Sequence, residues 1–197
     1  MMRAEQREYW SAARAVREPD GELEDLSQVA LSPSVARSLQ LQLDSPARLR
    51  GGLLFGEQRG DTLHVMLAST LGRSAWYSPS RNAVLDVDSR FILGRSEALR
   101  EISGGTTDWR GNWLMYDDSQ LHAQRKDHRW FRSGQRLGLF DARHVLLVVG
   151  WEGSCLTCRA YRRDVDGQAE ELALNYEGVE LVEELKLSGS ASRLRDA

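Results

Sequence analysis

The sequence predicts a single mixed α/β domain, in which a β-sheet is flanked by helices. Segments with helical periodicity alternate along the chain with strand-like segments. Residues 145–150, Val-Leu-Leu-Val-Val-Gly, are apolar on both faces, which is typical of a buried central strand. The 197 residues are 41% hydrophobic and 28% charged, with a formal net charge of −3. This composition fits one domain with its own core and modest extensions.

The chain is expected to divide into three parts. An N-terminal helical arm, which ends in a turn and an acidic stretch, is predicted over residues 1–25. The domain is expected to span residues 26–187, and a polar tail is expected over residues 188–197. No run approaches the 18 apolar residues of a membrane span, and the charged N-terminus lacks the apolar core of a signal peptide. We therefore expect a cytoplasmic protein without a membrane partner.

The elements of the domain follow from local signals. Ser32 and Pro33 are typical of an N-cap and a first helical position, and the apolar spacing extends this helix to about Leu43. Asp88 is the expected cap of a second helix. The predicted strands are residues 29–31, 51–56, 62–69, 113–116, 145–150, 155–163, 172–176 and 179–187.

The stretch 111–127 is the expected place for a functional site. Residues 113–116 form an apolar run, Asp117 to Ser119 supply turn and N-cap chemistry, and a helix is predicted over 119–132. The two aspartates would then favour the positive end of the helix dipole. In open α/β sheets a strand end of this kind is where ligands bind.

Three patterns carry a family resemblance. Residues 51–56 read Gly-Gly-Leu-Leu-Phe-Gly, Gly111 and Trp113 precede the polar turn, and Asp127 lies in the helix that follows. On these residues the chain resembles a bacterial member of the JAB/MPN (JAMM) family of zinc-dependent isopeptidases. In that family a glutamate precedes the glycine-rich strand, a His-x-His-Pro sequence ends the later strand, and Ser-x-x-Asp follows on a helix. The resemblance implies an MPN-like, cytidine-deaminase-like α/β sandwich built on a curved mixed sheet.

The resemblance also places the family's zinc site on particular residues of this chain. The catalytic glutamate position falls on Leu49, the two histidine positions on Leu114 and Tyr116, and the aspartate position on Asp127. A catalytic zinc requires three ligands from His, Asp, Glu or Cys. Only Asp127 is such a residue, and no His-x-His pair exists in the chain. The expectation is a degenerate, metal-free member without catalytic residues.

Function then divides into three hypotheses. In the first, the domain is a pseudoenzyme that binds another protein or a second copy of itself. The candidate contact residues are Trp76, Tyr77, Trp109 and Arg110. In the second, it is a metal-dependent (iso)peptidase with an unconventional zinc site. The candidate ligands of that site are Asp117, Asp118, His122 and Asp127.

In the third hypothesis, the basic and aromatic helix predicted over 119–132 binds single-stranded nucleic acid, because phosphates attract Lys and Arg while bases stack on aromatic rings. The balance of 26 basic against 29 acidic residues is unfavourable to it.

Cys155 and Cys158 form a Cys-x-x-Cys pair within a predicted strand. Residues three apart on a strand point to opposite faces, so we expect structural cysteines and no zinc site.

Overall fold

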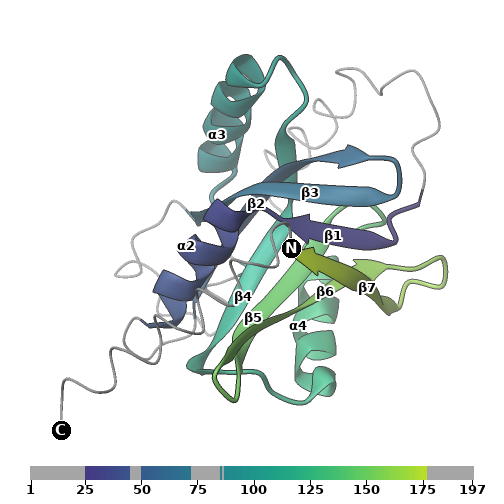
Figure 1. Ribbon diagram of the computed structural model, residues 1–197. Coiled ribbons are helices and arrows are strands. Elements are labelled where there is room, and N and C mark those ends of the chain that lie inside the picture. Colours follow the sequence, from purple (N-terminus) through teal and green to yellow (C-terminus); the bar gives the residue numbers. More distant parts are fainter. Residues whose placement is uncertain (1–24, 45–49, 72–84, 86, 177–197) are drawn as a thin grey trace, which may run out of the picture.

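The computed structural model describes residues 25–44, 50–71, 85 and 87–176, and this part of the chain forms seven strands and three helices (Figure 1). In chain order the elements are β1 (Gln28–Leu31), α2 (Pro33–Leu43), β2 (Arg50–Arg59), β3 (Thr62–Thr70), α3 (Ser89–Ile102), β4 (Asp108–Gln120), α4 (Gln124–Arg136), β5 (Val145–Glu152), β6 (Cys155–Arg163) and β7 (Ala169–Tyr176). The predicted arm up to residue 24, the predicted strand 179–187 and the polar tail lie outside the described residues.

The strands form a closed barrel in the order β1-β3-β2-β4-β5-β6-β7. The pairs β1–β3, β4–β5 and β1–β7 are parallel, and the remaining pairs are antiparallel. The predicted mixed α/β class is confirmed. The predicted mixed sheet is present, and it closes into a barrel because β1 pairs on both sides and so joins the two ends of the sheet.

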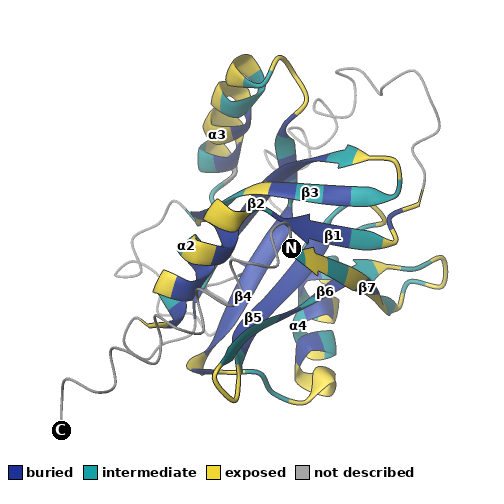
Figure 2. Ribbon diagram, viewed as in Figure 1, coloured by how far each residue is buried: buried dark blue, intermediate teal, exposed yellow. Residues whose placement is uncertain are grey.

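Alternating side chains of the strands divide the apolar residues into two clusters. One cluster includes Met115 and Leu147 and takes residues from all seven strands, so it fills the barrel interior, where Leu39 of α2 packs against it. The other includes Leu114 and Phe131 and combines the opposite face of β2, β4, β5 and β6 with the helices α3 and α4. Figure 2 shows β4 and β5 as the most continuously buried strands, which matches their place between both clusters.

The first two helices begin where the sequence indicates. The side chain of Ser32 accepts a hydrogen bond from the Val35 backbone N–H at 3.4 Å, and Pro33 occupies the first turn of α2. The Asp88 carboxylate accepts from the Arg90 N–H at 3.0 Å at the start of α3. The β2–β3 hairpin is also confirmed, and its turn contains Gly60 in the left-handed region with φ of 58°.

The third helix begins later than predicted. Strand β4 continues to Gln120, which pairs with Trp151, and α4 begins only at Gln124. Ser119 adopts a φ of 58°, which a helix cannot accommodate, and the Asp118 carboxylate caps the N–H of Gln120 at 3.0 Å. The prediction that Asp117 and Asp118 form a helix N-terminus was therefore wrong.

Among the helices of the described part, none combines the length and the apolar character needed to cross a membrane.

Candidate functional site

The most distinctive polar group is the carboxylate of Asp127, which lies in the first turn of α4 and is fully buried. The hydroxyl of Tyr116 on β4 donates to its Oδ1 at 2.7 Å. The hydroxyl of Tyr161 on β6 donates to its Oδ2 at 3.0 Å. A buried carboxylate requires such donors, because burial without them would cost several kcal/mol.

A guanidinium completes this group, which we call the Asp127 network. Arg159 Nη2 lies 3.1 Å from Asp127 Oδ2 and donates to the backbone carbonyl of His122 at 2.5 Å. The ion pair balances the buried negative charge, and the bond to His122 joins β6 to the loop that precedes α4. The network therefore connects β4, β6 and α4 through one carboxylate.

Both phenols of the network are neutral donors. Burial is the largest cause that raises the pKa of Tyr116, and its hydrogen bond to Asp127 raises it further. Burial also raises the pKa of Tyr161, followed by the negative charge of Asp127. A phenol that keeps its proton is a poor metal ligand, because the lone pairs that a metal ion would use are far less basic than those of a phenolate.

Three of the four residues that the resemblance assigned to a zinc site come together here, and they do not fit zinc. Leu114 lies two positions before Tyr116 on the same face of β4, is buried among apolar side chains and has no ligand atom. Tyr116 is a neutral donor, and both oxygens of Asp127 are engaged. Leu49 lies outside the described residues. The chemistry of this donor set is that of a structural hydrogen-bond network.

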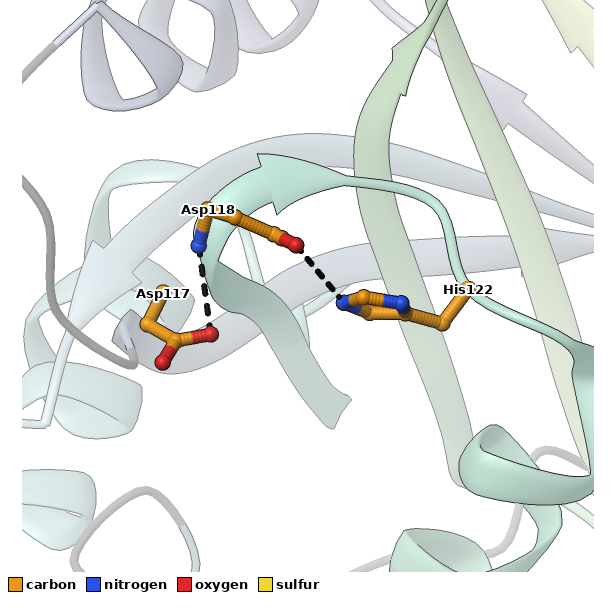
Figure 3. A group of neighbouring side chains, drawn as sticks. All are labelled: Asp117, Asp118 and His122. Carbon is orange, nitrogen blue, oxygen red and sulfur yellow. Dashed lines mark hydrogen bonds and ion pairs between the residues drawn. The ribbon is translucent and has the colours of Figure 1, made fainter.

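A second cluster of polar groups lies at the end of β4 (Figure 3). One ligand atom from each of Asp117, Asp118 and His122 lies within 4.8 Å of the others, and His122 Nε2 is 3.1 Å from Asp118 Oδ2. Both aspartates are exposed and His122 is half-buried. Asp127 is not a member of this cluster, which brings together three of the four candidate ligands.

The loop between these two groups is fixed by a buried arginine. Arg50 donates from Nη2 to Ser119 Oγ at 2.5 Å and from Nη1 to the carbonyl of Gln42. Ser119 Oγ in turn donates to the carbonyl of Leu43 at 3.0 Å. This chain of bonds ties the end of α2 to the end of β4, where Asp117 and Asp118 lie. Sequence patterning did not identify Arg50, because a charged residue at a strand start is ordinarily read as exposed.

The predicted contact residues are placed differently from our expectation. Trp109 is only 3% exposed and packs in the outer apolar cluster, with its ring 4.1 Å from that of His144. Its side chain belongs to the core, so its assignment as a surface contact was wrong. Arg110 is half-buried, and burial is the largest cause that lowers its pKa. Trp76 and Tyr77 lie outside the described residues.

The two cysteines are free and lie on β6, as the strand pattern predicted. Cys158 is buried in the barrel interior, where burial raises the pKa of its thiol to about 12. Cys155 lies three residues earlier and is half-buried. A thiol that keeps its proton at neutral pH is inert as a nucleophile and as a zinc ligand.

Arg159 and Tyr161 were not among the residues predicted from the sequence. Both lie on β6, two residues apart, and so point to the same side of the sheet. The available signal was weak: an arginine two residues before a tyrosine, in a strand that contains two further arginines at its end. The two side chains reach Asp127 only because β6 pairs with β5 and α4 crosses that face of the sheet. Local sequence patterns predict neither arrangement.

The raised pKa values of Tyr116 and Tyr161 predict how stability depends on pH. The folded protein retains phenolic protons that the unfolded chain releases near its ordinary value of 10.0. The folded state therefore binds more protons above that pH, and stability is lost as the pH rises further. We expect urea denaturation to show a free energy of unfolding that declines above about pH 10.

The matched control is the double variant Tyr116→Phe, Tyr161→Phe. Lysines and thiols titrate in the same range, so the informative quantity is the slope against pH and not the absolute stability. The double variant should decline less steeply than the parent protein. Equal slopes would show that the two phenols titrate alike in the folded and unfolded states.

Comparisons with known proteins give information about the fold and not about the function. No family model matches the chain, and no curated protein matches it. Among solved structures it is similar to the solution structure of protein DSY2949 from Desulfitobacterium hafniense, with a TM-score of 0.50 and 17% sequence identity. That match covers 76% of this chain and 92% of the other. At this identity the similarity concerns the arrangement of the backbone.

Proposed function

We propose that this chain is a catalytically inactive domain with a JAB/MPN-like scaffold, and that it acts as a protein-interaction or scaffold module. The Asp127 network carries the proposal. It occupies the place where the resemblance puts a catalytic zinc, and it engages both carboxylate oxygens with two phenols and a guanidinium. Leu114 fills the adjoining position with an apolar side chain. A site of this chemistry stabilises a fold and does not activate water.

The order of elements supports the choice of scaffold. A glycine-rich strand and its hairpin partner, β2 and β3, are followed by α3, by β4 and by a helix with a buried aspartate. This is the order that the resemblance implies for the family's glycine-rich strand, ligand strand and aspartate helix.

Metal content is the first test. The protein is purified without chelator, its metals are measured by elemental analysis, and its melting temperature is compared with and without added zinc and chelator. We expect far less than one metal ion per chain, no thermal response and no hydrolysis of a fluorogenic isopeptide substrate. Stoichiometric zinc that is lost in Asp127→Asn would overturn the proposal, because it would make Asp127 a ligand.

A metal-dependent hydrolase remains the second candidate function, and one observation favours it. Two carboxylates and an imidazole converge at the end of β4, a donor set that suits Zn²⁺ or Mn²⁺. The same experiment separates it from the first candidate. Zinc bound there would be lost in His122→Ala and retained in Asp127→Asn, whereas zinc at the family position would show the opposite pattern.

A further inference from the structure

Helix α4 carries a strongly basic exposed face. Its exposed basic side chains are Arg125, Lys126, Arg129, Arg132 and Arg136. The helix contains one carboxylate, Asp127, which is buried and paired with Arg159. Within the described residues, no ion pair joins any of these five cations to a carboxylate. The face therefore presents uncompensated positive charge to solvent.

Four of the five cations form a line, which we call the arginine stripe: Arg125, Arg129, Arg132 and Arg136. Their spacing of i, i+4, i+7 and i+11 keeps them within an arc of about 60° on an α-helix, over a length of about 16 Å. The buried residues of the helix, Asp127, Phe131 and Gly134, lie on the opposite side. The Asp127 network and the packing of Phe131 thus fix the direction in which the stripe points.

This arrangement opposes the stability of its own helix. Like charges at i, i+3 and i+4 repel one another, and Arg125 lies in the first turn, where the helix dipole disfavours a cation. The N-cap position is Ala123, which makes no side-chain cap bond. Gly134 lies inside the helix, where a glycine costs roughly 1 kcal/mol relative to alanine. The cost at Gly134 belongs to the buried side, where an added Cβ would lie 2.0 Å from Cε2 of Phe140, whereas the cost of the charged face is explained by an anionic ligand that neutralises it.

We propose that the arginine stripe docks a short acidic segment of a partner protein, one with carboxylates repeated along one face of a helix. The inference rests on the proposed function and specifies the chemistry of the partner. Helical carboxylates at the same spacing would meet the guanidiniums in register, and each guanidinium can bind a carboxylate through two parallel hydrogen bonds. Complementary charge along two helices sets both partner choice and register.

The surroundings of the stripe favour a short acidic segment over a long polyanion. At the start of α4, Gln124 donates to the carboxylate of the exposed Glu171 at 2.7 Å. Near its end, Gln135 donates to the carbonyl of Gly167, in a turn that also contains the half-buried Asp164 and the exposed Asp166. Carboxylates thus border the stripe at both ends, and the chain as a whole carries a net charge of −3. An extended phosphate backbone would meet repulsion beyond the helix.

The test uses a fluorescein-labelled helical peptide of about 20 residues, built from alanine and glutamine with glutamates at i, i+4, i+7 and i+11. Its control is a peptide of the same composition whose glutamates are distributed around the helix. Fluorescence anisotropy with the full chain in 0.1 M salt should show tighter binding of the striped peptide, weakening as salt is added. In Arg129→Gln, Arg132→Gln the affinity should fall roughly tenfold.

The control variant is Arg90→Gln, Arg95→Gln, which removes two exposed arginines from α3 and should leave the affinity unchanged. Equal affinity for the two peptides, or an affinity that the α4 variant does not change, would overturn the proposal. A labelled single-stranded 20-mer oligonucleotide that binds more tightly than the peptide, through the same arginines, would replace it with nucleic-acid binding. Elemental analysis is independent of these results, so failure here and failure of the metal-free assignment are distinguishable.

Discussion

Replacing Asp127 by alanine is expected to lower the free energy of unfolding by about 3–5 kcal/mol. The variant would leave the guanidinium of Arg159 without its buried counter-charge and two phenols without their acceptor. The phenols would then bear their desolvation cost uncompensated and Arg159 would keep only its bond to the His122 carbonyl, in addition to the cavity left by the side chain. Urea denaturation followed by circular dichroism measures the change.

Asp117→Ala is the matched control, because this aspartate lies near the end of β4 and is exposed. It should change stability by no more than about 0.5 kcal/mol. If Asp127→Ala were as mild as the control, the network would not support the fold, and the assignment of Asp127 to a structural role would fail. A free carboxylate awaiting a ligand would give that mild result.

Replacing Gly52 by alanine should be the other large effect, a loss of about 3 kcal/mol or more. An added Cβ would lie 1.8 Å from the backbone oxygen of Ser69 and 2.4 Å from Nε1 of Trp113. These two atoms are hydrogen-bonded to each other at 2.9 Å, and both belong to strands that pair with β2. The clash cannot be relieved by turning a flexible side chain.

Gly94 offers a matched control in the middle of α3, where an added Cβ would meet no atom within 4 Å. Gly94→Ala should raise stability by up to about 1 kcal/mol, because alanine is the better helix former. Thermal or urea denaturation of the two variants gives the comparison. A tolerated Gly52→Ala would show that β2 and β3 can separate locally, against the close backbone approach described above.

Local signals in the sequence were enough to predict several elements. Ser32 with Pro33 and Asp88 each act through neighbouring backbone groups, so their helices began where expected. The hairpin of β2 and β3 was equally local. The start of α4 was mispredicted because Ser119 is held by Arg50 and Leu43, residues distant in sequence whose bonds override the capping propensity of the Asp-Asp-Ser turn.

The candidate site was predicted in part. Tyr116 and Asp127 lie within hydrogen-bond distance of each other, and they come from a strand and from the helix after it, which are neighbours in sequence. Arg159 and Tyr161 were not found, since their approach to Asp127 depends on long-range pairing. Closure of the barrel was missed for the same reason: it depends on a short strand, β1, that pairs with β7 at the far end of the described chain.

Closure of the barrel also limits how a partner can bind. A sheet edge offers a row of unsatisfied N–H and C=O groups, which an incoming peptide can use to add itself as another strand. In the described part of this chain each of the seven strands pairs on both sides over part of its length, so strand segments with one neighbour are short and include β3 beyond Val65 and β6 before Ala160. A partner that does not add a strand at such a short segment binds side chains projecting from helices and loops, and substitutions at those positions can change the choice of partner without disturbing the backbone pairing beneath.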